Sequence, residues 1–164
     1  GWPAFNIELA LHEGDPIEYL YGLCEGKPPK SRKMDVIAVG VVLAIPPYPF
    51  GHDKVEEVVN VPIWGVTPGI EDDLHFADVM SGEAPSISSG VMDREPHLAT
   101  AGSYVMIGTG TGENVVEARK GAHRVLDRLT IPVSPFYRND IGTRLRAQLP
   151  KLQEHGFATG ISYA

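Results

Sequence analysis

The stretch from Tyr104 to Gly142 constrains the fold more than any other part of the chain. It begins with an apolar run, passes through a glycine-rich segment at residues 108–112, and continues into residues 113–129, where apolar positions recur at three- and four-residue steps. The first pattern predicts a strand and the last predicts an amphipathic helix. Thr111 is expected to cap this helix, because its hydroxyl can accept a first-turn amide hydrogen. The sequence therefore predicts a strand–turn–helix unit.

The glycine-rich segment invites comparison with nucleotide-binding loops. A dinucleotide-binding loop has Gly-x-Gly-x-x-Gly between parallel strands and a helix, but here Glu113 stands at the third glycine position. The preceding strand is expected to pair with residues 97–100 in an antiparallel hairpin, through a tight turn at 101–103. A structural turn is therefore predicted, and a small nucleotide-binding enzyme remains an open alternative.

The middle of the chain predicts a small antiparallel sheet. Residues Val36–Ile45 are nearly all apolar and β-branched, as in a strand buried on both faces. Val58–Val66 is expected to form an edge strand because Pro62 interrupts it, and further short strands are expected at 87–92 and 97–100. The predicted class is α+β: a sheet or flattened barrel from about Val36 to Thr109, covered by the helix at 113–129.

The N-terminal part has its own pattern. Residues 1–8 predict a short strand, and Asp15-Pro16 followed by Glu18 predicts the start of a helix that ends at Gly26. The polar, proline-bearing segment 27–33 is the best candidate for a linker. We therefore predict a boundary between residues 1–33 and a C-terminal domain at 34–164.

Composition excludes several classes of protein. The chain has 164 residues and a net charge of −7 at pH 7, whereas nucleic-acid-binding domains usually carry a basic surface. No apolar run approaches the ~20 residues that cross a bilayer, and no secretory signal is present. With a single cysteine, Cys24, an internal disulfide is impossible, and a cytoplasmic location without nucleic-acid or membrane partners is expected.

Several motifs together resemble one enzyme family. Gly108 and Gly110 are followed by Glu117-Ala118-Arg119 and later by Tyr-Arg-Asn-Asp-Ile-Gly at 137–142. This order resembles the C-terminal part of the phosphoribosylamine–glycine ligases, which are ATP-grasp ligases of purine synthesis. The similarity extends to Val36–Pro49, and to Phe5-Asn6 and Gly14-Asp15-Pro16 near the N-terminus.

The resemblance implies both a fold and an activity. Residues 1–26 would be the last strand and helix of an ATP-grasp domain, and the remainder a rudimentary form of the single-hybrid-motif domain. In such ligases ATP phosphorylates the carboxylate of glycine, and the amine of phosphoribosylamine then attacks it, with magnesium neutralising the phosphates. The lysines and glycine loop that hold ATP would lie in an upstream ATP-grasp domain, the expected partner. We expect this fragment to be inactive alone; the alternative is a diverged, non-catalytic binding or interface module.

The resemblance also implies a metal site at Asn6. The family has a glutamate two residues before this asparagine, but Ala4 stands there in this chain. Glu8 lies two residues after Asn6 and would point to the same face of a strand, so it is a candidate replacement ligand. Alternatively, both are ordinary surface side chains.

Three further residues are candidates for substrate binding. Asp15 matches an aspartate near the family's active site, although helix capping alone would explain it. Arg138 and Asp140 belong to the 137–142 motif, and arginine suits planar recognition of phosphate or carboxylate; an ion pair that fixes the turn is the alternative. The family also has an arginine close to Asp15 that this chain lacks, which weakens a phosphate contact there.

Overall fold

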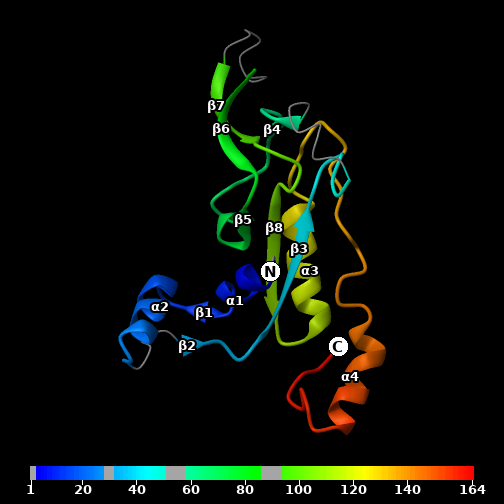
Figure 1. Cartoon of the computed structure of the whole chain (residues 1–164). Helices are drawn as coiled ribbons and strands as arrows, with labels where there is room; N and C mark the ends of the chain where they lie inside the picture. The colour runs from blue at the N-terminus through cyan, green and yellow to red at the C-terminus, as the bar shows by residue number, and fades with distance from the viewer. Residues whose placement is uncertain (1–2, 28–31, 51–57, 86–93) are drawn as a thin grey trace. The chain divides into compact units, whose positions relative to one another are not determined.

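A computed structural model describes residues 3–27, 32–50, 58–85 and 94–164 (Figure 1). The chain forms two compact units: unit 1 comprises residues 1–40, 109–123 and 140–164, and unit 2 comprises 41–108 and 124–139. The helices and strands follow one another as α1 (Ala4–Leu9), β1 (His12–Glu13), α2 (Pro16–Cys24), β2 (Arg32–Lys33), β3 (Ile37–Leu43), β4 (Pro62–Ile63), the 3-10 helix η2 (Glu71–Asp73), β5 (Leu74–Phe76), β6 (Val79–Pro85), β7 (Arg94–Thr100), β8 (Met106–Gly112), α3 (Val115–Leu126) and α4 (Leu145–Glu154).

The strands form three small sheets, and the α+β class is confirmed. Their orders are β1-β2, β3-β8-β5 and β4-β7-β6. Strands β1 and β2 pair antiparallel, as do β4 with β7, β5 with β8, and β6 with β7. The strand predicted at Val36–Ile45 is present as β3, whose β-branched residues fit a pleated, buried surface.

Unit 2 is built around the long β6–β7 pairing. The register runs from Val79 opposite Thr100 to Pro85 opposite Arg94. Thr100 is fully buried, and its hydroxyl donates to the carbonyl of Val58 at 2.5 Å and accepts the amide hydrogen of Val61. A buried hydroxyl with both roles satisfied fixes the chain before β4 against β7.

The hairpin predicted between residues 97–100 and the following strand is wrong. β7 pairs with β4 and β6, whereas β8 pairs with β3 and β5. The segment between them is held instead by Asp78, whose carboxylate accepts the Tyr104 amide hydrogen at 3.1 Å. Gly102 leaves room for this carboxylate, because a Cβ there would lie 2.5 Å from Asp78 Oδ2 and would force that side chain to move.

Two further predictions for this unit need correction. Of the strand expected at Val58–Val66, only β4 is extended, and it lies at a sheet edge as Pro62 requires. The strand expected at 87–92 lies outside the described residues. β6 was not predicted at all, since its sequence has neither clear alternation nor a β-branched run.

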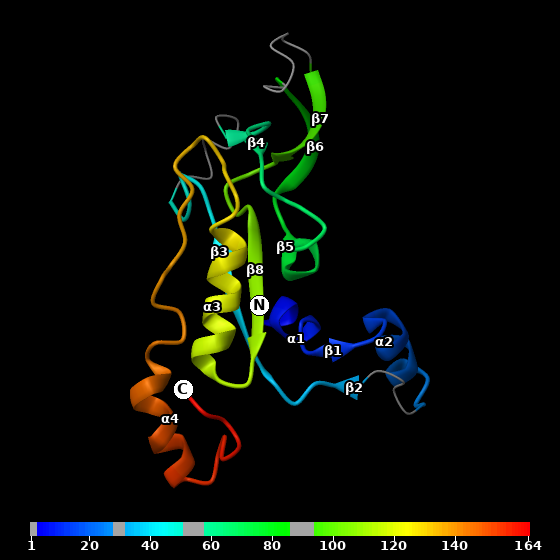
Figure 2. The same cartoon turned by 180° about the vertical axis from the view of Figure 1, so that it is seen from behind.

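In unit 1, the glycine-rich segment continues a strand instead of forming a turn. β8 extends through the glycines to Gly112, and α3 runs alongside it in both views (Figures 1 and 2). A Cβ on Gly110 would lie 2.3 Å from the Ala122 nitrogen and 2.5 Å from the Ala118 oxygen. The glycines therefore allow a helix backbone to approach the strand closely.

The start of α3 also differs from the prediction. Asn114, not Thr111, caps the helix, because its Oδ1 accepts the Glu117 amide hydrogen at 2.9 Å. The C-terminal segment supplies two more acceptors: the carbonyls of Ser162 and Tyr163 each take an amide hydrogen from the first turn, both at 3.1 Å. The chain end is thus bound to the start of α3.

The N-terminal helix prediction is confirmed in α2, and the strand predicted at residues 1–8 is wrong. Asp15 accepts the Ile17 amide hydrogen at 2.7 Å, Pro16 occupies the first turn, and Gly26 has a φ of +67° just beyond the helix. Residues 4–9 instead form α1, a short helix without a side-chain cap. The boundary predicted at residue 33 stays a prediction.

Candidate functional site

The side chain of Asn6 has a buried polar atom that lacks a hydrogen-bond partner among the described residues. This atom is Oδ1, and the residue is 7% exposed. Leaving a buried acceptor unsatisfied costs about 1–3 kcal/mol, and such groups are rare in folded proteins. An oxygen of this kind can accept a hydrogen bond or coordinate a cation.

Glu8 is occupied by other side chains of the chain. Its carboxylate oxygens lie 2.9 and 3.1 Å from Lys33 Nζ, and Oε1 lies 3.5 Å from His12 Nε2. His12 lies four residues after Glu8, in β1, and the antiparallel β1–β2 pairing places Lys33 opposite His12. The hydrogen bond from Lys33 holds the pKa of the Glu8 carboxyl below its usual value.

Because these residues lie on a helix, the geometric basis for pairing Asn6 with Glu8 is wrong. Residues two apart on a helix differ by about 200° in direction, whereas on a strand they would share a face. The Asn6 oxygen is of a type that magnesium binds, whereas the Glu8 carboxylate is paired with Lys33. No group of three or more His, Cys, Asp or Glu suited to a metal occurs in the part of the chain that the structure describes. The metal role of the two residues stays a prediction.

Asp15 is exposed and serves as the N-cap of α2. Gly14 precedes it with a φ of +96°, a backbone conformation that favours glycine. The cap accounts for one oxygen of the carboxylate and leaves the second facing solvent or a ligand. A role in substrate binding therefore stays a prediction beside an observed structural role.

The 137–142 motif divides between the two units. In unit 2, Tyr137 donates a short hydrogen bond to Asp127, which raises the pKa of Tyr137 to about 12. In unit 1, the Asp140 carbonyl accepts from the Thr143 amide at 3.0 Å and from its hydroxyl at 2.6 Å. Arg138 and Asp140 are both exposed, and their roles in substrate binding stay predictions.

Arg119, within the family-like Glu-Ala-Arg segment, ties α3 to this motif. Its Nε donates to the Ile141 carbonyl at 2.5 Å. Gly142 has a φ of +77°, and a Cβ there would lie 3.1 Å from the Arg119 side chain. Arg119 and the Ile-Gly end of the motif therefore form one structural contact.

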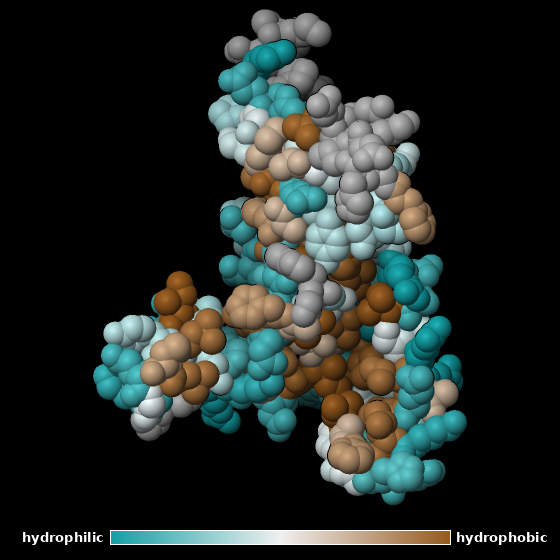
Figure 3. Space-filling view, in the orientation of Figure 1, coloured by the Kyte–Doolittle hydropathy of each residue, from teal (hydrophilic) through white to brown (hydrophobic). Residues whose placement is uncertain are grey.

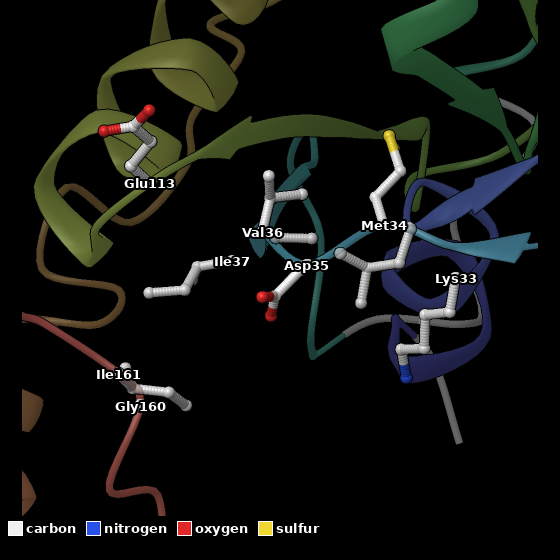
Figure 4. Close-up of a pocket in the computed structure, with 10 residues that line it drawn as sticks. Lys33, Met34, Asp35, Val36, Ile37, Glu113, Gly160 and Ile161 are labelled. Carbon is white, nitrogen blue, oxygen red and sulfur yellow. The ribbon is translucent and has the colours of Figure 1, made fainter.

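Unit 1 also contains a groove of about 620 Å³ that sequence reasoning missed (Figure 4). Its walls come from segments far apart in sequence, so no local pattern could indicate it. The lining residues are Leu11, Lys33, Met34, Asp35, Val36, Ile37, Ala38, Glu113, Gly160 and Ile161.

Helix α2 presents an apolar face that nothing in the described chain buries. None of its residues is buried, and four large side chains are exposed: Ile17 at 74%, Leu20 at 46%, Tyr21 at 64% and Leu23 at 50%. We call these four residues the α2 face. Hydrophobic surface is visible over α2 in Figure 3. Clustered exposed apolar side chains are typical of surfaces that another protein segment covers.

Comparisons with known proteins place these features in context. The chain is 28% identical over 138 residues to phosphoribosylamine–glycine ligase of Pasteurella multocida, a match that covers 83% of this chain and 28% of the relative. It is also 28% identical over 134 residues to the same enzyme of Haemophilus influenzae, covering 80% and 28%. The resemblance to the C-terminal part of these ligases is confirmed, and the chain spans less than a third of their length.

The fold comparison agrees. The crystal structure of phosphoribosylamine–glycine ligase from Thermotoga maritima matches with a TM-score of 0.60 at 23% identity, over 85% of this chain and 30% of that one. This similarity concerns the fold alone. No protein-family profile matches the chain. Among the described residues, no helix is long and apolar enough to span a membrane.

Proposed function

We propose that the chain is the C-terminal part of an ATP-dependent carboxylate–amine ligase of the phosphoribosylamine–glycine type. The observation that carries this proposal is the sequence similarity across 83% of the chain to a relative named for that reaction. Because the chain corresponds to 28% of that relative's length, most of the nucleotide-binding machinery belongs to another stretch of polypeptide. The chain alone then has no ligase activity.

In this proposal, the N-terminal segment of residues 1–26 completes an ATP-grasp domain. Residues 1–26 contribute its last elements, and residues 34–164 form a hybrid-motif-type domain beyond the linker. The uncovered α2 face supports this, since four exposed apolar side chains on one short helix need a partner surface. The upstream ATP-grasp domain is the proposed partner.

Asn6 is the residue best suited to hold magnesium in the assembled enzyme. Its orphaned, buried Oδ1 is a hard oxygen ligand of the type magnesium prefers. Bound magnesium would neutralise charge on the transferring phosphate. Glu8 has no part in this proposal as a ligand, because breaking its contact with Lys33 would leave the ammonium without its carboxylate.

Asp15, Arg138 and Asp140 are proposed to lie near the substrates of the assembled enzyme. Arg138 provides a planar guanidinium suited to phosphate or carboxylate. Asp15 is oriented by its capping bond to Ile17. Their contribution is binding and positioning, since ligases of this kind need their protein mainly to orient charged substrates.

A second candidate is a diverged, non-catalytic binding or interface module of the same fold. Two observations favour it: Ala4 stands where the ligases have a glutamate, and Lys33 occupies the carboxylate of Glu8. Under this alternative the α2 face still binds a partner, but no nucleotide chemistry follows.

A fusion experiment separates the two candidates. The chain would replace the matching stretch of the Pasteurella multocida ligase, and ADP release would be measured with ATP, glycine and phosphoribosylamine. We expect the isolated chain to be inactive and the fusion to be active, with activity reduced by Asn6→Ala. Robust turnover by the isolated chain would contradict the proposed division of labour. A fusion that folds and binds ATP but shows no turnover would favour the non-catalytic module.

A further inference from the structure

The groove of unit 1 has an apolar floor. Six of its ten lining residues are apolar and come from three places: the turn after α1, the β2–β3 segment and the C-terminal segment. The apolar members are Leu11, Met34, Val36, Ile37, Ala38 and Ile161. A volume of about 620 Å³ lies within the range of small-molecule sites, roughly 300–1,000 Å³.

The C-terminal wall of the groove is held in place by side-chain and backbone bonds. Gln153 donates from Nε2 to the Ile161 carbonyl at 2.9 Å and to the Ala158 carbonyl at 3.2 Å. The next residue, Ser162, accepts the Val115 amide hydrogen at the start of α3. The backbone on either side of the Ile161 side chain is therefore held by hydrogen bonds.

The charged side chains that line the groove carry more negative than positive charge. Lys33 is matched by the carboxylate of Glu8, which leaves Asp35 and Glu113 as uncompensated negative charges. No hydrogen bond or ion pair to either carboxylate occurs within the described ranges, and both residues are exposed. In Figure 4 the Asp35 carboxylate lies toward Ile37 and Ile161, with Lys33 at the other end of the groove.

We propose that this groove binds a small organic cation, a primary amine that carries an apolar body. Its ammonium group donates to the Asp35 carboxylate, and its apolar body lies against Ile37 and Ile161. Glu113 also lines the groove, but its carboxylate points away from Asp35 in Figure 4, so its charge acts only over a longer distance. Charge-assisted hydrogen bonds of this kind are stronger than neutral ones, and burial of the apolar body adds to affinity. This site is separate from Asn6 and needs neither nucleotide nor magnesium.

The test is titration of the isolated chain with n-hexylammonium, followed by ¹H–¹⁵N NMR. Amide shifts should saturate and map to residues 33–38 and 160–161. Hexanol, which lacks the charge, should bind about two- to fivefold more weakly, and methylammonium, which lacks the apolar body, should not saturate at the same concentrations. Equal shifts with hexanol would overturn the assignment of a cation site.

Variants give the second arm of the test. Asp35→Asn should weaken binding of n-hexylammonium about two- to fivefold, and Glu113→Gln should weaken it less. Glu154→Gln, an exposed acid of unit 1 that does not line the groove, should leave affinity unchanged. If Asp35→Asn keeps a native spectrum and full affinity, the proposal is wrong. Because no ligase substrate is used, this result is independent of the proposed function.

Discussion

Two regions of unit 1 show opposite ways of stabilising a helix. α3 lies so close to β8 that only glycine fits at position 110, and Val115, Ala118 and Ala122 are fully buried. α2 has no buried residue, and its N-cap and its glycine stop are both exposed. Both helices have clear sequence signals, but only one of them has a packed face.

This difference separates local from tertiary stabilisation. Caps and exposed ion pairs each contribute on the order of 1 kcal/mol or less, whereas dense packing contributes several kcal/mol per large buried side chain. A helix of nine residues is marginal in water without packing. α3 is therefore stabilised by packing within the described chain, whereas the described residues provide no such packing for α2, and the proposed function assigns its cover to an upstream domain.

The largest effect is expected from Gly110→Ala. The added Cβ would lie within 2.5 Å of two backbone atoms of α3, so the helix must shift, and destabilisation by about 3–5 kcal/mol is expected. Gly69→Ala is the matched control, because a Cβ there meets nothing within 4 Å. Urea unfolding of both variants measures the effect; equal midpoints would show that the β8–α3 contact is looser than described.

A smaller effect is expected from Asp15→Ala. Loss of the capping bond to Ile17 should destabilise α2 by about 1 kcal/mol. Asp15→Asn should retain most of the stability, since asparagine caps equally well. Helical circular dichroism and amide exchange in residues 16–24 report the change. An Asn variant as impaired as the Ala variant would mean that the charge of Asp15, and not its cap, matters.

Glu8→Gln should have a still smaller effect, and it should depend on pH. The lowered pKa of Glu8 means that its pair with Lys33 contributes stability above the usual carboxyl value of 4.5 and loses it as pH falls through the lowered pKa. For this exposed pair the contribution is about 0.2–1 kcal/mol. The difference in unfolding free energy between wild type and variant should therefore be greatest near neutral pH and vanish in acid. A difference that persists unchanged at pH 2 would contradict an ion-pair origin.

The smallest change in stability is expected from Ile17→Ser. This side chain is 74% exposed, so its replacement should change the free energy of unfolding of the isolated chain by less than about 0.5 kcal/mol. In the fusion with the rest of a ligase, the same variant should reduce stability clearly. Comparing melting temperatures in both contexts measures this, and a large loss in the isolated chain would mean that the α2 face is already covered.

How much the sequence could predict follows the same division. Local signals succeed where they act locally: Asp15, Pro16 and Gly26 define α2, and the apolar run defines β3. They fail where distant segments decide. β7 and β8 do not form the predicted hairpin but belong to two different sheets. β7 pairs instead with β6, whose sequence has no clear strand pattern, and Asp78 binds the segment that connects β7 to β8.

The candidate site divides likewise. The resemblance indicated Asn6, and the structure shows that its Oδ1 is buried without a hydrogen-bond partner among the described residues. The strand geometry behind the pairing of Asn6 with Glu8 is wrong, because residues 4–9 form a helix. Lys33, 25 residues away, also donates to the Glu8 carboxylate, and the metal role of the two residues stays a prediction. The groove was beyond prediction, since Asp35, Glu113 and Ile161 meet only after folding.

Amide hydrogen exchange of the isolated chain tests the central claim most directly: α3 is stabilised by this chain, and α2 awaits a partner surface. Amides in α3 near Ala122 should exchange only through global unfolding, while those of Leu20 and Leu23 should exchange by local opening, at least about 100-fold faster. Fusion to the remaining ligase should slow the α2 amides and leave α3 unchanged. Protection of α2 equal to that of α3 in the isolated chain would contradict the account.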